Sequence, residues 1–290
     1  METNIALSNA IKSLDGLSVG DAFGELFFRR SPFESTFADL PQTFWEWTDD
    51  THMALSIVEV LKENGRIDQD ELAKLFARRY KQDPQRGYAG GAHRLLGKVA
   101  KGGSWRDISP TLFGTGSFGN GSAMRVAPIG AFFYSDLDRV KKEAELSAEV
   151  THYHSEGRAG AIAVAVAAAI AASRPFPTGN DFLQAVLPHI PEGMVKSGVE
   201  LAMQIPSDAI IDAMKQLGSG EKVSAQDTVP FCLWSAAHHL GDFESAMWNT
   251  AKGLGDVDTT CAIVGGIVAL SVPEIPQAWI ARREPLGLTF

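Results

Sequence analysis

Hydrophobic residues recur at helical spacing along nearly the whole chain. Near the N-terminus, Leu7, Ile11, Leu14 and Leu17 follow one another at intervals of four, three and three residues, which places their side chains on one face of an α-helix. Further segments share this character, and none alternates as a half-buried β-strand does. These segments are 53–63, 70–80, 91–101, 137–150, 155–172, 180–189, 207–217, 229–240, 245–252 and 259–271. The sequence therefore predicts an all-α fold, a compact multi-helix bundle.

Glycine and proline mark where the helices are expected to stop. Gly16, Gly20 and Gly24 follow the first periodic stretch and are expected to interrupt it. Loops are expected where Gly, Pro, Ser and Asp gather, at 28–43, 102–122 and 218–227. No internal repeat or biased linker divides the chain, so residues 1–290 are expected to form one domain.

Charge and cysteine content narrow the classes of partner. The chain has 26 basic and 35 acidic residues, a formal net charge of −9. Broad surfaces for nucleic acid or anionic membranes need basic patches, so neither partner is expected. No basic segment followed by an apolar one opens the chain. Cys232 and Cys261 lie in apolar contexts and are expected to be buried free thiols in a reducing compartment, which favours a cytoplasmic protein.

The most apolar stretch, 159–173, is dominated by alanine. A membrane-spanning helix needs about 20 apolar residues, so this stretch is judged too short to cross a bilayer. It is expected to form a buried helix that packs closely on its neighbours, and no membrane contact is predicted. The oligomeric state is left open.

Two acidic clusters lie at the entrances of helical segments far apart in the sequence. The first acidic cluster is Thr48, Asp49 and Asp50, and the second is Asp256, Asp258 and Thr259. The alternative for each cluster alone is a helix cap, because Asp and Thr oxygens accept hydrogen bonds from free backbone N–H groups. One cap needs one oxygen, however, and crowded carboxylates repel each other. A hard divalent cation relieves that repulsion and selects oxygen ligands, so the two clusters together predict a metal site.

A glycine-rich segment lies between the clusters. Gly119 and Gly121 allow close approach of the backbone to a ligand, and Ser122 precedes a helical segment whose first N–H groups are suited to an anion. An ordinary turn is the alternative. The spacing does not match the G-x-x-x-x-G-K-[ST] loop, which argues against a nucleoside triphosphatase of that type.

Histidines recur after the helix predicted at 137–150. His152 and His154 are separated by one residue, but no nearby Cys or H-E-x-x-H pattern completes a zinc set. His152 is interpreted as a hydrogen-bonding residue beside a ligand pocket. For His154 the alternative is an exposed residue next to a helix capped by Ser155. The pair at 238–239 is interpreted as lying on a helix flank.

Five motifs occur in a fixed order along the chain. They are Gly20-Asp21-Ala22-Phe23-Gly24, Trp47-Thr48-Asp49-Asp50-Thr51, Gly119-Asn120-Gly121-Ser122-Ala123-Met124-Arg125, Thr151-His152 and Gly255-Asp256-Val257-Asp258-Thr259. In this order the chain resembles the ADP-ribosylglycohydrolase family, from about Ile11 to Leu270. Each motif is modest alone, but their order is specific.

The resemblance implies an all-α hydrolase with a binuclear Mg²⁺ centre, or Mn²⁺ in its place, that releases ADP-ribose from an acceptor. The acceptor is a modified protein or a small ADP-ribosyl compound. By position, the metal ligands correspond to Thr48, Asp49, Asp50, Asp256, Asp258 and Thr259. Asp49 or Asp50 is assigned as the catalytic carboxylate. The residues corresponding to the ADP-ribose cleft are Gly119, Gly121, Ser122 and His152.

One departure from the family pattern bears on the acceptor. Many relatives carry a Glu at the place of Phe28, and in relatives that cleave serine linkages this Glu takes part in the chemistry. Glu25 lies one helical turn earlier, and whether it replaces the missing carboxylate is left open. An arginine linkage is therefore expected. Two alternatives stay open: a non-catalytic ADP-ribose-binding protein of the same fold, and a Mg²⁺-dependent nucleotide phosphohydrolase.

Overall fold

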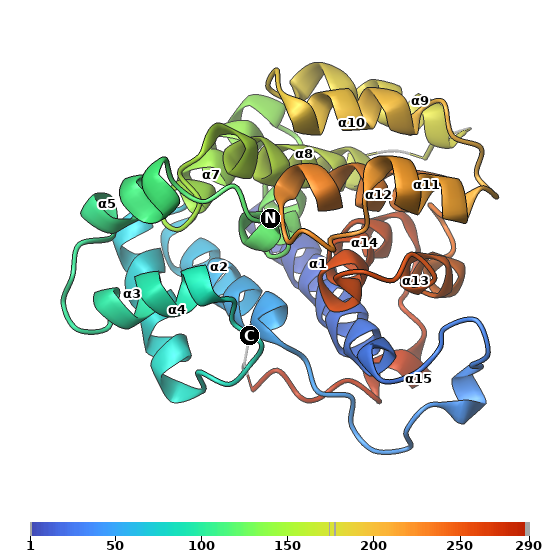
Figure 1. The fold of residues 1–290 in the computed structure, drawn as a ribbon, viewed down its shortest axis with the longest axis horizontal. Helices are drawn as coiled ribbons and strands as arrows, with labels where there is room; N and C mark the ends of the chain where they lie inside the picture. The colour runs from blue at the N-terminus through green and yellow to red at the C-terminus, as the bar shows by residue number, and fades with distance from the viewer. Residues whose placement is uncertain (1, 174, 177, 288–290) are drawn as a thin grey trace.

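The computed structural model describes residues 2–173, 175–176 and 178–287, which form α-helices joined by loops and short 3₁₀ helices (Figure 1). Within these ranges the only β-type pairings are isolated bridges. The α-helices are α1 (Glu2–Glu25), α2 (Asp49–Asn64), α3 (Gln69–Gln82), α4 (Gly90–Val99), α5 (Trp105–Ile108), α6 (Ala127–Phe132), α7 (Leu137–Glu149), α8 (Ser155–Ser173), α9 (Gly179–Val186), α10 (Met194–Ala202), α11 (Ile210–Leu217), α12 (Ala225–His238), α13 (Phe243–Ala251), α14 (Val257–Val268) and α15 (Gln277–Ile280). The 3₁₀ helices are η1 (Leu26–Phe28), η2 (Phe37–Asp39), η3 (Ser109–Gly114), η4 (Asn120–Ser122), η5 (Leu187–His189) and η6 (Ala269–Ser271). The all-α prediction is confirmed.

Helices α1 and α14 pack with their backbones in contact. A Cβ atom on Gly20 would lie 2.1 Å from the carbonyl oxygen of Cys261, so only glycine fits at this position. The equivalent contacts join Gly16 with Gly265, Gly20 with Cys261, and Gly24 with Val257. Because the residue numbers rise along α1 while they fall along α14, the two helices are antiparallel. The C-terminal half of α1 therefore lies beside the start of α14.

The glycines at 16, 20 and 24 do not interrupt the first helix, so that prediction was wrong. Glycine in a helix interior costs about 1 kcal/mol relative to alanine, and close packing on α14 offsets this cost. The sequence also missed α10 (Met194–Ala202). Its interior Gly198 weakens the helical pattern, but a Cβ there would lie 2.4 Å from the ring of Pro230 on α12. Cys232 and Cys261 are buried free thiols, as predicted.

Helix α8 (Ser155–Ser173) is 19 residues long, longer than the apolar run at 159–173. By length and composition alone this helix is long and apolar enough to cross a membrane, so the prediction that the stretch is too short was wrong. In the folded chain 78% of the apolar stretch of this helix is buried. Helices α6, α7, α12 and α14 pack against it. Its position is that of a buried core helix, as predicted.

Three helix segments meet where the acidic clusters lie. Helix α1 contacts both α2 and α14, and α2 also contacts α14. Figure 1 shows α1 crossing the middle of the molecule between them. The first acidic cluster begins α2 and the second begins α14, so the fold brings together two clusters that are about 200 residues apart in sequence.

Candidate metal and ligand-binding site

Asp21 of α1 anchors the start of α2. Its carboxylate accepts hydrogen bonds from the backbone N–H of Thr48 at 2.9 and 3.0 Å and from the Thr48 hydroxyl at 2.9 Å. It also accepts from the backbone N–H of Thr51 at 3.0 Å and the Thr51 hydroxyl at 2.6 Å. Asp21 is fully buried. One side chain thus satisfies free N–H groups at the N-terminus of α2 and fixes the direction in which this helix leaves α1.

Three buried carboxylates converge at this point. Asp21, Asp50 and Asp258 each offer an oxygen within 4.8 Å of the others. Thr48 Oγ1 lies 2.9 Å from Asp50 Oδ2 and 3.5 Å from Asp258 Oδ2. The capping interpretation of the clusters is wrong, since neither Thr48 nor Asp256 makes a side-chain cap hydrogen bond at the helix that it precedes.

The electrostatics of the cluster favour a bound positive charge. Burial, followed by repulsion from neighbouring carboxylates, raises the pKa of Asp50 and of Asp258 well above the usual range. The same two causes raise the pKa of Asp49 to about 8. Burial raises the pKa of Asp21 to about 6 despite its four hydrogen bonds to threonines. Burial also raises the pKa of Asp256. A cation among these groups would restore their charged forms.

The oxygen atoms present fit a hard divalent cation. Asp50 Oδ1 is buried and has no hydrogen-bond partner. The Thr48 hydroxyl has one proton, yet its oxygen lies 2.9 Å from oxygens of both Asp21 and Asp50. Every group in the cluster is a carboxylate or hydroxyl, which are ligands that Mg²⁺ and Mn²⁺ prefer. The orphaned oxygen and the hydroxyl shared between two carboxylates both suit ligands of a cation.

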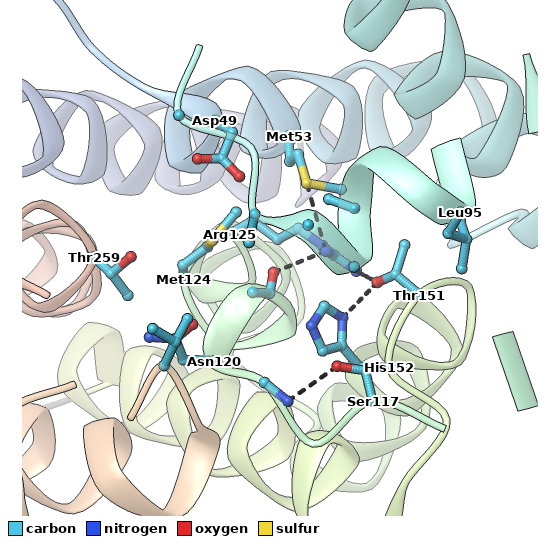
Figure 2. A pocket seen from close by; sticks show the side chains of 18 of the residues that line it. Asp49, Met53, Leu95, Ser117, Asn120, Met124, Arg125, Thr151, His152 and Thr259 are labelled. Atoms are coloured by element: carbon cyan, nitrogen blue, oxygen red, sulfur yellow. Dashed lines mark hydrogen bonds between the residues drawn. The ribbon is translucent and has the colours of Figure 1, made fainter. Parts of the chain in front are cut away.

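A cavity of about 610 Å³ opens beside the cluster (Figure 2). It has the size of a pocket for a small organic ligand. The predicted site residues that line it are Asp49, Gly119, Gly121, His152, Asp256, Asp258 and Thr259. Thr48 and Asp50 are not in the lining and lie deeper, with Asp50 only 1% exposed. The cavity therefore joins the carboxylates to the glycine-rich segment.

The glycine-rich segment is tied to the second acidic cluster. It forms the 3₁₀ turn η4, and the Asn120 amide donates to Asp256 Oδ2 at 2.7 Å and to Thr228 Oγ1 at 3.1 Å. Ser122 was predicted to line the cleft, but its buried hydroxyl donates to the backbone oxygen of Gly157 at 2.8 Å. Ser122 is absent from the cavity lining. Its role in this structure is to attach η4 to α8.

His152 lies at the end of a hydrogen-bonded series that begins with Arg125. The guanidinium of Arg125 is fully buried and donates to the backbone oxygen of Gly121 at 2.8 Å and to Thr151 Oγ1 at 2.8 Å. Thr151 Oγ1 lies 2.7 Å from His152 Nδ1 (Figure 2). His154 instead accepts from the N–H of Glu156 at the start of α8. The interpretation of His154 as a residue of the helix start is the one that its contacts favour.

The other histidines lie elsewhere. His238 and His239 lie at the end of α12, and His239 Nδ1 is 2.7 Å from the backbone oxygen of Ser235. Among the described residues, no group that satisfies metal-ligand spacing contains a histidine or a cysteine. Glu25 and Phe28 do not line the cavity either, and Phe28 is 51% exposed. Glu25 is therefore not among the carboxylates that face the cavity.

The loop between α3 and α4 completes the wall and was not predicted. Gly87, with a φ of +87°, adopts a backbone conformation that favours glycine, and a Cβ there would lie 3.1 Å from Asp49 Oδ1. Arg86 holds the loop: it pairs with both oxygens of Glu284 at 2.6 and 2.8 Å and donates to the backbone oxygen of Trp47 at 2.9 Å. Glu284 in turn donates its N–H to the oxygen of Trp45.

Four functional residues escaped the sequence analysis. Asp21, Asn120 and Arg125 lie inside the motifs listed above, so their polar side chains within those motifs were the available signal. The structure shows that all three side chains are buried. Arg86 had no signal, because its partner lies 198 positions away.

Comparison with known proteins identifies the family. The model of the ADP-ribosylglycohydrolase family matches residues 2–288, and the chain belongs to this family. It is similar to ADP-ribosylhydrolase ARH3 of Homo sapiens, with 30% identity over 270 residues that cover 80% of this chain and 73% of the relative. It is also similar to ADP-ribosylarginine hydrolase Tri1 of Pseudomonas putida, with 26% identity over 96% of this chain and 74% of the relative.

A solved structure shares the fold. A chain described as part of an ADP-ribosylglycohydrolase-related protein complex superposes with a TM-score of 0.70 and 22% sequence identity, covering 97% of this chain and 94% of the other. At this identity the likeness is evidence for the fold alone. It agrees with the predicted bundle of the ADP-ribosylglycohydrolase type.

Proposed function

We propose that this protein is a metal-dependent hydrolase that releases ADP-ribose from an ADP-ribosylated acceptor. The observation that carries the proposal is the meeting of buried carboxylates from three helices at one end of a 610 Å³ cavity. Gly119, Gly121 and His152 also line this cavity. Membership of a glycohydrolase family supports the reaction class.

Two divalent cations, Mg²⁺ or Mn²⁺, fit this chemistry. Thr48, Asp50 and Asp258 would hold them at the base of the pocket, with Asp49, Asp256 and Thr259 facing the cavity beside them. When bound, such cations supply positive charge that neutralises the carboxylates and orients the ribose hydroxyls of the substrate. Asp21 would act behind these ligands by fixing Thr48.

The burial pattern separates the roles of the two adjacent aspartates. Asp49 faces the cavity (Figure 2), whereas Asp50 lies beneath it. A general base must reach the water from which it takes a proton. We therefore assign Asp49 as the base that accepts a proton from the water entering at the ribose anomeric carbon, and Asp50 as a ligand. Cleavage at this carbon builds oxocarbenium-like charge, which the surrounding carboxylates stabilise.

The remainder of the cavity suits the adenosine diphosphate portion. Gly119 and Gly121 line the cavity with backbone that can approach a diphosphate. His152 packs beside both glycines, since a Cβ on either would lie 3.0 to 3.2 Å from its ring. Leu95, Leu112 and Phe113 provide an apolar region for the adenine ring. Phe113 is 61% exposed and has a φ of +58°, a strained conformation that is often kept at a binding site.

For the acceptor we propose an arginine linkage. A serine linkage is expected to need the early Glu of relatives, and here the exposed Phe28 takes its place while Glu25 lies outside the cavity lining. A guanidine nitrogen leaves readily once protonated, so the aspartates of the pocket suffice. The similarity to an arginine hydrolase is consistent with this proposal.

The test is a side-by-side turnover measurement on ADP-ribosyl-arginine and ADP-ribosyl-serine peptides, with Mg²⁺, with Mn²⁺ and with excess chelator. We expect metal-dependent release of ADP-ribose that is faster from arginine and unchanged in Glu25→Gln. Faster release from serine would overturn the linkage. Tight binding of ADP-ribose without turnover would favour a binding protein, and phosphate release from nucleotides would favour a phosphohydrolase.

A further inference from the structure

The two ring nitrogens of His152 face different partners. Nε2 is directed at the glycine-rich wall of the cavity, because a Cβ on Gly119 or Gly121 would lie 3.2 or 3.1 Å from it. Nδ1 lies 2.7 Å from Thr151 Oγ1, inside the protein. Figure 2 shows the ring between Thr151 and the open cavity. Which nitrogen carries the proton therefore decides whether His152 offers the cavity a donor or an acceptor.

Arg125 determines the direction of the hydrogen bond between Thr151 and His152. A guanidinium has donors and no acceptor, so Thr151 Oγ1 accepts the 2.8 Å bond from Arg125 Nη2. The hydroxyl proton of Thr151 then needs an acceptor of its own. Among the described residues, the only acceptor recorded within hydrogen-bonding distance is His152 Nδ1. A proton on Nδ1 would leave the Thr151 hydroxyl proton without an acceptor among the described residues, which is costly for a buried group. The contact therefore favours an unprotonated Nδ1, and in a neutral ring the proton is then on Nε2.

We propose that Arg125, acting through Thr151, fixes His152 as a neutral imidazole protonated on Nε2, so that His152 is an obligatory hydrogen-bond donor to a diphosphate oxygen of the ligand. Arg125 and Thr151 are positioning residues in this arrangement. The identity of the ligand group rests on the proposed function. The position of the proton rests on the protein's own hydrogen bonds.

The charge of the ring agrees with this geometry. Burial, with the positive charge of Arg125 as a further cause, lowers the pKa of His152 to about 3. The ring is therefore neutral near pH 7 and acts through hydrogen-bond direction. With its proton on Nδ1, it would present a lone pair to the anionic diphosphate, which is repulsive. The fixed tautomer removes this state before the ligand arrives, which is a form of preorganisation.

Further contacts hold the Arg125 guanidinium in place. It also donates to the backbone oxygens of Gly121 and Ser147, and its guanidinium lies 4.6 Å from the ring centre of Phe76. Because Gly121 lies on the cavity wall, the same cation fixes both the wall and the donor that faces the ligand. The spacing between the backbone at Gly121 and His152 Nε2 is thereby set by a single side chain.

The first experiment reads the proton directly. In the full chain labelled with ¹⁵N-histidine and free of ligand, two-bond ¹H–¹⁵N spectra near pH 7 should show pyrrole-type Nε2 and pyridine-type Nδ1 for His152, assigned by loss of its signals in His152→Gln. A protonated Nδ1 in the wild-type protein would overturn the proposal whether or not the protein binds ADP-ribose. The tautomer is read in the wild-type protein, and the His152→Gln variant serves only to assign the signals.

The second experiment separates the positioning role from simple packing. Thr151→Ser keeps the hydroxyl and should keep the tautomer and the affinity for ADP-ribose measured by calorimetry. Thr151→Val keeps the shape, and we expect averaged ring-nitrogen signals and about 10-fold weaker ADP-ribose binding. Wild-type spectra and affinity in Thr151→Val would overturn the relay. If ADP-ribose fails to bind the wild-type protein while the tautomer is as expected, the proposed function fails and the proton assignment stands.

Discussion

Asp21 and Thr48 are joined twice, through the Thr48 backbone N–H and through its hydroxyl, although they lie 27 positions apart. This double contact holds the first acidic cluster in register with α1. The α1 helix is itself held in register with α14 by glycine contacts. The relative position of the two clusters therefore depends on Asp21 together with the glycine contacts of α1.

The Asp21→Asn substitution should impair the site without unfolding the helices. An amide nitrogen in place of one oxygen faces N–H and O–H donors, so part of the anchor is lost. We expect metal affinity or turnover to fall about 10- to 100-fold, as for other residues that orient metal ligands. Calorimetric titration with Mn²⁺ and circular dichroism measure the two effects. Asp15→Asn, on the same helix but paired with Arg283, is the control, and equal losses in both variants would contradict the prediction.

Replacement of Asp50 should separate stability from activity. Asp50→Asn removes one of several mutually repelling carboxylates, so the protein kept in chelator should melt at the same or a higher temperature. Turnover should fall about 100-fold or more, because a ligand has been removed. Addition of Mg²⁺ should raise the melting temperature of the wild-type protein but not that of the variant. A metal-free variant that melts well below the wild type would show that the repulsion is unimportant.

Stability in chelator should fall as the pH rises. The pKa of Asp49 is raised from 3.8 to about 8 and that of Asp21 from 3.8 to about 6 in the folded protein. The folded state thus binds more protons than the unfolded state between these values, and the stability present below pH 4 is lost as the pH approaches 8. Urea denaturation at pH 5 and pH 8 tests this. The loss of unfolding free energy between pH 5 and pH 8 should be smaller in Asp49→Asn and in wild-type protein with Mg²⁺. A wild-type protein in chelator that is more stable at pH 8 than at pH 5 would contradict the prediction.

A methyl group on Gly121 should disturb the ligand more than the fold. It would lie 3.0 Å from His152 Cε1 and 3.1 Å from Nε2, so Gly121→Ala should displace the imidazole and weaken ADP-ribose binding about tenfold. Gly90→Ala is the matched control, because Gly90 also lines the cavity but its added Cβ meets no atom within 4 Å. Calorimetry and thermal melting compare the two. An equal loss of affinity in both would mean that general crowding is responsible.

The helices and the motifs could be predicted from the sequence because both are local properties. Periodic leucines and valines indicate helices, and crowded carboxylates indicate the clusters at 48–50 and 256–259. The continuation of α1 through Gly20 could not be predicted, because it depends on the backbone of α14. The position of Ser122 also depends on a tertiary contact, because its hydroxyl bonds to Gly157 on α8. The sequence therefore placed it in the cleft wrongly. Which of Asp49 and Asp50 faces the cavity is also decided by tertiary packing.

The contact between Arg86 and Glu284 has a consequence for the order in which the protein matures. During synthesis the first acidic cluster, the loop at Arg86 and the glycine-rich segment emerge long before the second acidic cluster, and Glu284 emerges later still. The loop at Gly87 gains its two contacts from Arg86 to the Glu284 carboxylate only when Glu284 has been made. A nascent chain that has folded most of its helices therefore still lacks a finished pocket. The pocket wall is thus completed by a contact between residues 198 positions apart, which no N-terminal part of the chain can make on its own.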